Sequence, residues 1–286
     1  MYDVIALNGL LLSCIYLLIS TGFSLVYGVF RIFYFGFTIT YTFVPYLTWI
    51  FWKDFNLALP MAFAIMIVLQ ILYSIASYKW CIKPNLADEG RLFMATLLIW
   101  IFFEELINFK YPIVAGVNFP AFLKGEIRVG SINLALQLLA CCIISIALIL
   151  SLAFFLLKTK IGLSIRAVSQ DRAAAELMGI DVDRVYLYAM IISIFPPTIC
   201  LVMIAPFWEI SPYMGFPLLL TALIISIIGG LGNLKGTIIA SFIIGFLHSA
   251  VSFIFSPRFT MLSGLFCALL ILLLRPRGLI AGERVW

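Results

Sequence analysis

The chain has 286 residues, of which 64% are apolar and only 11% charged, with 18 Lys and Arg residues against 13 Asp and Glu. Soluble globular domains carry roughly 25% charged residues, so this composition excludes an ordinary soluble enzyme or binding domain. Several apolar runs approach the roughly 20 residues that cross a hydrocarbon core, and they are apolar on all sides. The sequence therefore predicts an all-α, polytopic helical membrane protein with a single transmembrane domain over residues 1–286.

Apolar runs separated by turn residues predict about eight to ten membrane-spanning helices, with nine as the best count. They lie at residues 5–29, 34–52, 58–79, 92–108, 132–157, 185–206, 216–230, 236–255 and 259–274. The segment 216–230 is short enough to be a re-entrant or half helix. The first run lacks the basic region of a secretory signal and is long enough to remain as a permanent helix.

The distribution of basic residues predicts the orientation, because nine crossings place the two termini on opposite sides. With the C-terminus in the cytoplasm, thirteen Lys and Arg residues face inward and five face outward, as the positive-inside rule requires. The five outward residues are Lys53, Lys110, Lys124, Arg128 and Arg258. The net charge of +5 then follows from topology and gives no support for nucleic-acid binding.

Small residues recur at every fourth position in two of the predicted spans. One set is Ser20, Ser24 and Gly28, and the other is Thr237, Ser241, Gly245 and Ser249. Small residues at this spacing let helix backbones approach closely in lipid, so both sets predict helix-packing seams; a pore lining is the alternative. The six cysteines show no metal-ligand or disulfide spacing, and we expect them to be packing residues.

Two further features are candidates for a solute path. The proline pair at 196–197 removes two backbone donors and predicts a broken helix, as in many transporters, with a structural kink as the alternative. The glycine-rich segment 229–236 predicts a tight turn between closely packed helices and lacks the spacing of a nucleotide-binding loop. The candidate path residues are Asn8, Pro196, Pro197, Gly229, Gly230 and Gly232.

Ionisable residues near the predicted spans are few: Glu104, Glu105, Glu209 and His248. An acid inside a membrane is by default a functional candidate, and a stand-alone channel or ion-coupled carrier that uses Glu104, Glu105 and His248 stays open as an alternative. No catalytic motif surrounds them, which gives enzyme function no support and predicts no catalytic or metal-binding residue.

A polar loop at residues 158–184 interrupts the apolar sequence between two predicted spans. Within it, residues 169–178 predict a short helix capped by Ser169, with Asp171 in its first turn and Gly179 just past its end. Ala173, Ala174, Leu177 and Met178 are expected to form an apolar strip that rests against the membrane domain. Asp181 is expected to cap the next span.

The polar loop resembles the cytoplasmic loop of the branched-chain amino acid ABC transporter permeases. The matching stretch, Lys160–Val185, reads K-I-G-L-S-I-R-A-V-S-Q-D-R-A-A-A-E-L-M-G-I-D-V-D-R-V. The resemblance continues through A-P-F-W-E-I-S-P-Y-M-G-F (Ala205–Phe216), I-G-G-L-G-N-L-K-G (Ile228–Gly236), L-L-R-P-R-G-L (Leu273–Leu279) and the first span, Asn8–Ile32.

The resemblance implies an importer subunit of the prokaryotic inner membrane, with its N-terminus outside and no ATP site or cofactor of its own. Its implied partners are a second permease subunit, two cytoplasmic ATP-binding subunits, an external solute-binding protein and the lipid bilayer, and no nucleic acid. The residues implied to couple it to the ATPases are Gln170, Asp171, Arg172, Ala174, Glu176, Leu177, Met178, Gly179 and Ile180.

Two departures from the family pattern concern the cargo. After the first span the family usually reads R-V-x-N-F-A-H-G-E, whereas Arg31–Ile39 reads R-I-F-Y-F-G-F-T-I here. The family's R-P-L-R-type segment is replaced by Cys81–Asn85. Branched-chain or related hydrophobic amino acids are the leading cargo that the resemblance implies, and urea or short amides are the alternative.

Overall fold

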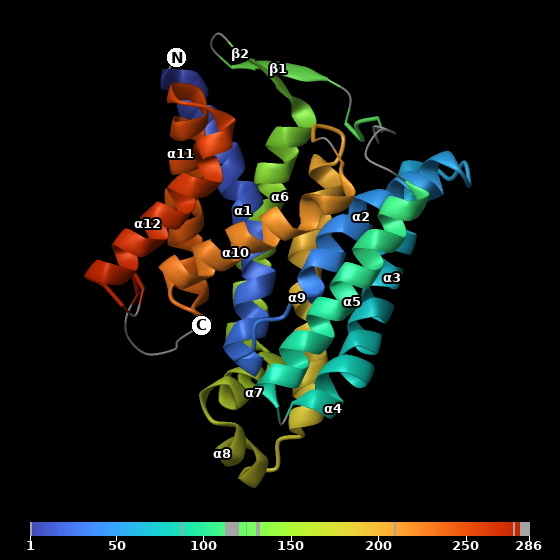
Figure 1. Cartoon of the computed structure of the whole chain (residues 1–286), viewed down its shortest axis with the longest axis vertical. Helices are drawn as coiled ribbons and strands as arrows, with labels where there is room; N and C mark the ends of the chain where they lie inside the picture. Colours follow the sequence, from blue (N-terminus) through green and yellow to red (C-terminus); the bar gives the residue numbers. More distant parts are fainter. Residues whose placement is uncertain are drawn as a thin grey trace.

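The computed structural model describes residues 2–86, 88–111, 120–123, 125–129, 132–208, 210–276 and 278–280, and helices make up most of this part (Figure 1). The α-helices are α1 (Tyr2–Phe30), α2 (Gly36–Lys53), α3 (Leu59–Ala76), α4 (Lys83–Asn85), α5 (Glu89–Lys110), α6 (Leu136–Lys158), α7 (Lys160–Gln170), α8 (Arg172–Leu177), α9 (Val182–Ile204), α10 (Gly215–Gly229), α11 (Leu234–Ile254) and α12 (Thr260–Leu274). A π-helix, η1 (Ser77–Ile82), joins α3 to α4, and 3₁₀ turns η3 (Pro212–Met214) and η4 (Pro257–Phe259) precede α10 and α12.

The prediction of an all-α polytopic membrane protein is confirmed. Within the described residues, eight helical segments are long and apolar enough to cross a membrane. The predicted segment 34–52, which is not among these eight, forms α2. This helix is rich in Thr and Tyr and buries most of its residues against its neighbours. Since other helices screen α2, it does not need the apolar surface that lipid requires. The count of nine is therefore approximate.

The helices pack around α1, which contacts α6, α9, α10 and α11 (Figure 1). Helix α10 runs obliquely across the bundle (Figure 1). The N-terminus lies at one end of the molecule, here called the hairpin end, and α7 and α8 lie at the opposite end, here called the loop end.

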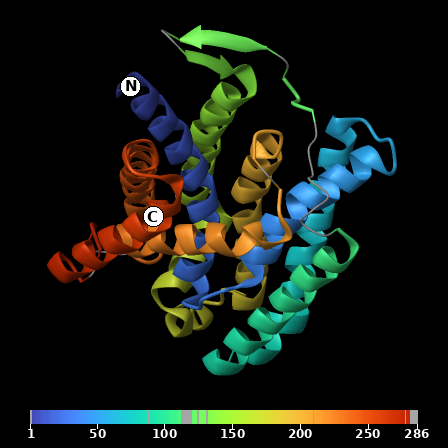
Figure 2. The ribbon, with the colours of Figure 1, turned by 45° about the horizontal axis from the view of Figure 1, so that its top comes forward.

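The hairpin end carries the only strands among the described residues, β1 (Glu126–Val129) and β2 (Ile132–Ala135). They pair antiparallel, with Glu126 opposite Ala135, and Figure 2 shows them extending above α1 and α6. The predicted span 132–157 therefore began too early, because residues 132–135 pair as a strand. Helix α6 starts at Leu136, whose N–H donates to the Gly125 carbonyl at 3.0 Å.

The small-residue faces of α1 and α11 pack against each other, which confirms the predicted packing seam. Thr237 donates to the Ser24 hydroxyl at 2.9 Å, and Ser249 donates to the Ile5 carbonyl at 2.8 Å. A Cβ added at Gly245 would stand 2.3 Å from the Ser13 hydroxyl oxygen, so only glycine allows this approach. The seam therefore lies within the chain.

Candidate functional site

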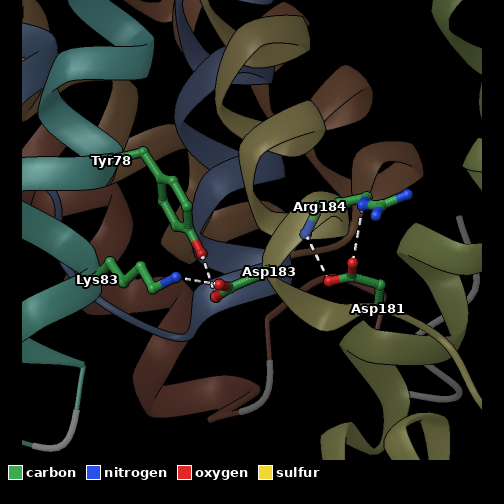
Figure 3. Close-up of polar contacts among 5 residues, drawn as sticks. All are labelled: Tyr78, Lys83, Asp181, Asp183 and Arg184. Carbon is green, nitrogen blue, oxygen red and sulfur yellow. Dashed lines mark hydrogen bonds and ion pairs between the residues drawn. The ribbon is translucent and has the colours of Figure 1, made fainter.

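The polar loop folds into two short helices, α7 and α8, whose first turns are closed by side chains. Thr159 accepts from the Gly162 N–H at 3.0 Å at the start of α7, and Asp171 accepts from the Ala174 N–H at 3.0 Å at the start of α8. Asp181 caps α9 as predicted, accepting from the Arg184 N–H at 3.2 Å and pairing with its guanidinium (Figure 3). Caps of this kind satisfy donors that a helix start leaves free.

The predicted helix 169–178 is wrong in its start. Ser169 belongs to α7, where its hydroxyl donates to the Arg166 carbonyl at 2.8 Å. The chain turns at Asp171, whose backbone is extended (φ −149°, ψ 110°), and this residue takes the capping role. Both residue types cap helices well. Here the α7 turn already engages the serine hydroxyl, so the aspartate ends one helix and begins the next.

The end of α8 follows the prediction. Gly179 has φ +80°, the left-handed region that favours glycine, and its N–H donates to the Glu176 carbonyl at 3.0 Å. The Ile180 N–H donates to the Ala175 carbonyl at 3.1 Å. These two bonds form the Schellman motif, which satisfies the last carbonyls of a helix and fixes the exit of the chain.

The predicted apolar strip on α8 does not rest against the membrane domain. Ala175, which is 4% exposed, is the residue that faces the bundle, whereas Leu177 and Met178 are 89% and 83% exposed. Ala173 and Ala174 are exposed as well. A six-residue helix makes fewer than two turns, and its capping geometry determines which residues face inward. The large apolar side chains therefore point away from the protein.

The charged residues of α8 pair within the helix. The Arg172 Nε atom lies 3.1 Å from a Glu176 carboxylate oxygen, and the guanidinium lies 5.8 Å from the ring centroid of Tyr186 on α9. Both members of the ion pair are about half exposed, which limits its contribution to at most about 1 kcal/mol. Glu176 is therefore already partnered within α8.

Arg31, at the end of α1, holds the junction of α7 and α8. Its guanidinium donates to the Ser169 carbonyl at 3.3 Å and to the Gln170 carbonyl at 3.1 Å. Its backbone has φ +58°, which costs a residue with a Cβ about 1–2 kcal/mol. The strained residue thus connects the loop end of α1 to the C-terminal carbonyls of α7, where a cation is favourable.

A second connection joins the start of α9 to the α3–α4 corner (Figure 3). The Asp183 carboxylate forms an ion pair with Lys83 of α4 and accepts from the Tyr78 hydroxyl of η1 at 3.0 Å. Sequence analysis missed this connection and the contacts of Arg31. The sequence shows only charged residues next to apolar runs. Such a charge does not identify a partner that lies 100 or 139 residues away.

An open cavity of about 660 Å³ lies where these connections meet. Its lining includes Arg31, Glu89, Asp171, Arg172, Glu176 and Tyr186, so it is polar and holds both signs of charge. Gln170, the last residue of α7, also lines it. The loop end of the molecule thus combines a braced short helix, an outward apolar tip and a charged hollow.

The proline pair at 196–197 does not break its helix, so that prediction is wrong. Helix α9 runs through both prolines, which are buried. Proline 197 removes the donor for the Ser193 carbonyl, and this oxygen would lie 2.4 Å from a Cβ added at Gly22 of α1. Because Gly22 has no Cβ, the backbone of α1 packs directly over the Ser193 carbonyl. Contact with a neighbouring helix in this way lets α9 continue through its prolines.

The predicted path glycines lie together in the α10–α11 turn, away from the prolines. Gly230 has φ +102° and Gly232 has φ +79°, as the predicted turn requires. A Cβ added at Gly232 would stand 2.7 Å from the Gly28 Cα atom, and one at Gly229 would stand 2.4 Å from Gly236. Asn8 is partly buried on α1, near the hairpin end. The cavities that described residues line at the loop end and beside α10 and α12 include none of these positions.

The intramembrane ionisable residues also lie apart. The His248 Nδ1 atom and the Tyr16 hydroxyl are 3.0 Å apart between α11 and α1, whereas Glu104 accepts from the indole N–H of Trp100 on α5 at 2.5 Å. Glu105 lies 3.5 Å from the Tyr213 hydroxyl. Glu209 lies outside the described residues. No shared proton path links the glutamates to His248 through the hydrogen bonds of the described residues.

Comparison with known proteins agrees with this architecture. The family model for the branched-chain amino acid transport system permease component matches residues 5–274. The high-affinity branched-chain amino acid transport system permease protein LivH of Escherichia coli (strain K12) is 23% identical, over 97% of this chain and 95% of its own length. The corresponding permease protein BraD of Pseudomonas aeruginosa is 20% identical over the same shares.

One solved structure, PsaBC from Streptococcus pneumoniae in complex with Fab, has a similar fold. The TM-score is 0.52 at 14% sequence identity, and the match covers 96% of this chain and 92% of that chain. At this identity the likeness supports the fold alone.

Proposed function

The chain belongs to the permease family of branched-chain amino acid transport systems, and from this premise we propose that it is the membrane-spanning subunit of an ABC importer for branched-chain or related hydrophobic amino acids. In this proposal the chain forms part of the solute path, and ATP is hydrolysed on separate subunits. Its partners are a second permease subunit, two cytoplasmic ATP-binding subunits and an external solute-binding protein.

The observation that carries the proposal is the exposed tip of α8. Leu177 and Met178 are 89% and 83% exposed on a helix that projects beyond the ends of the spanning helices (Figure 1). Large apolar side chains in water are unfavourable and gain free energy when a partner covers them. Gln170, Asp171 and Arg172 line the charged hollow beside the tip, and charges next to an apolar anchor favour one partner over others.

A stand-alone channel or ion-coupled carrier fits these observations less well. Such a protein has no need of a rigid helix outside the membrane with an apolar tip. It would also need a continuous intramembrane proton or ion path, and the described hydrogen bonds place Glu104 and His248 in separate pairs. Import of urea or short amides would use the same architecture and differs from the proposal only in the cargo.

The proposal also gives the orientation. The N-terminus and α8 lie at opposite ends of the molecule (Figure 1). Docking of cytoplasmic ATPases at α8 therefore places the N-terminus outside the cell. This is the orientation that the count of basic residues favours.

The test is copurification of an ATPase with the full chain in mild detergent, followed by uptake of labelled leucine, isoleucine, valine and urea in reconstituted vesicles. We expect a soluble ATPase to copurify and ATP-dependent uptake of the amino acids. Uptake that needs no ATPase would contradict the importer proposal. Uptake of urea without any amino acid would replace the cargo while leaving the importer architecture in place.

A further inference from the structure

Helix α5 carries a carboxylate within its membrane-spanning length, at Glu104. This residue lies six positions before Lys110, the last residue of the helix, which corresponds to a depth of about 9 Å along the helix axis. The side chain is partly buried, and it accepts a hydrogen bond from the Trp100 indole N–H, one turn earlier. Glu104 thus has a neutral polar partner and lies inside the membrane-spanning part of the helix.

Among the described residues, no lysine or arginine forms an ion pair with Glu104. An unpaired charge inside a membrane is costly, and such residues therefore face a protein interior or a water-filled cavity and find a partner there. The exposed part of Glu104 consequently does not suit lipid. In the proposed importer it belongs on the side of the chain that faces the solute path.

Three aromatic rings from three different elements stack beside this carboxylate. The Trp100 ring lies between Phe216 of α10, at a centroid distance of 4.9 Å and an interplanar angle of 11°, and Phe35 before α2, at 5.9 Å and 18°. We call these three residues the aromatic stack. Its rings are only partly buried. The stack therefore forms where α2, α5 and α10 meet and remains open to the outside of the chain.

A carboxylate beside aromatic rings is suited to an organic ammonium group. The carboxylate supplies charge-assisted hydrogen bonds, and because Phe35 and Phe216 stack on the Trp100 ring, only the outward parts of the stack remain for contact with a solute. The same rings offer apolar contact to an aliphatic side chain. Urea and short amides carry no positive charge and would gain much less from Glu104.

We propose that Glu104 and the aromatic stack form a recognition site for the ammonium group of an amino acid in the solute path. This inference rests on the proposed function and deepens it, because it favours a solute with an amine over a neutral amide. Glu104 binds the ammonium group, Trp100 positions the carboxylate through its indole N–H, and the flanking phenylalanines hold the indole in place.

The neighbouring Glu105 provides a matched control. It is exposed, and it lies 3.4 Å from the Asn108 amide nitrogen and 3.5 Å from the Tyr213 hydroxyl, away from the ring stack. Replacing either glutamate by glutamine keeps the size and one acceptor oxygen of the side chain and removes its charge. In Glu104→Gln the amide oxygen can still accept from Trp100, so the fold of α5 is retained.

The experiment uses the permease reconstituted with its ATPases, second permease and solute-binding protein, and it measures leucine uptake at saturating binding protein. Loss of one charge-assisted contact predicts that Glu104→Gln lowers the uptake rate about tenfold or more. The leucine uptake rate of Glu105→Gln is expected to stay within about twofold of that of the unmodified complex, because a solvated carboxylate contributes little. Assembly of the complex is expected to be unchanged in both variants, and the basal ATPase rate is expected to be unchanged in Glu105→Gln.

A second measurement tests binding rather than rate. Ile101→Cys lies one turn before Glu104 on the same face of α5, is 44% exposed and leaves the carboxylate in place. It is expected to react with a cationic thiol reagent and to be protected when leucine is supplied, whereas Glu105→Cys is not protected. Unchanged leucine uptake in Glu104→Gln, or equal protection at both positions, would overturn the ammonium site. Failure of the proposed function is distinguishable, because it appears as absence of leucine uptake by the unmodified complex.

Discussion

Truncation of Leu177 to alanine separates docking from folding. The side chain is 89% exposed and is followed by Met178, which is 83% exposed, so neither contributes to the packed bundle. Substitutions at such positions usually change the free energy of unfolding by no more than about 0.5 kcal/mol. Alanine also retains helix propensity at the last position of α8. The stability of the permease is therefore expected to stay within that range.

The effect on association is expected to be much larger. Full burial of a leucine side chain against a partner is worth about 1.5–3 kcal/mol relative to exposure. Alanine retains only the Cβ portion of this apolar surface, so a loss of about 1.5–2 kcal/mol follows if Leu177 enters an ATPase groove. Since 1.4 kcal/mol corresponds to a factor of ten, the dissociation constant for the ATPase should rise about ten- to thirtyfold.

The assay is titration of the purified ATPase onto the permease in nanodiscs, with the thermal unfolding of each variant measured alongside. Phe109→Ala is the control, because Phe109 is 91% exposed next to the last residue of α5, and this helix ends far from α8 (Figure 1). The substitution should therefore not alter ATPase binding. An unchanged dissociation constant for Leu177→Ala, with normal unfolding, would refute the docking role of the α8 tip. A drop in thermal stability would refute the premise that the side chain contributes nothing to the fold.

Three further predictions test the loop geometry, the packing seam and the orientation. Gly179→Val is expected to abolish uptake at normal expression, because valine at φ +80° adds backbone strain of about 1–2 kcal/mol. Gly179→Asn should retain uptake, because asparagine tolerates the left-handed region. Gly245→Val is expected to force α11 away from α1 and to lower stability by about 1–3 kcal/mol or more in thermal unfolding, whereas Ile243→Val, on the exposed face of α11, should not. A reporter placed before Tyr2 should be external and one fused after Trp286 cytoplasmic; the same side for both ends would contradict the orientation.

The features that could be predicted from the sequence are those governed by local rules. An apolar run of about 20 residues carries its own evidence for a spanning helix, so most predicted spans agree with the helices within a few residues. The cap at Asp181 and the left-handed Gly179 were likewise predictable, because capping depends on residues only a few positions apart. Local rules predicted the wrong start for α8, because Ser169 and Asp171 are both good capping residues and the rules do not decide between them.

The features that could not be predicted depend on partners far apart in the chain. The contacts of Arg31 with the end of α7 and of Asp183 with Lys83 span 139 and 100 residues, respectively. The continuity of α9 through its prolines depends on Gly22, which lies on another helix. The direction of Leu177 depends on how a six-residue helix is attached at both ends, and hydrophobic periodicity has no meaning over so short a length.

These long-range contacts determine how a force applied to α8 would spread. The loop is attached to α1 through Arg31 and to the η1–α4 corner through Asp183, and it continues directly into α9. Since α1 in turn packs backbone to backbone against α9 and the α10–α11 turn, pushing α8 displaces these helices together. The connection between α3 and α9 runs through the half-exposed Lys83–Asp183 pair, and an ion pair that is this exposed contributes at most about 1 kcal/mol. We therefore expect movement at the loop end to separate α3 from α9 before it disturbs α1.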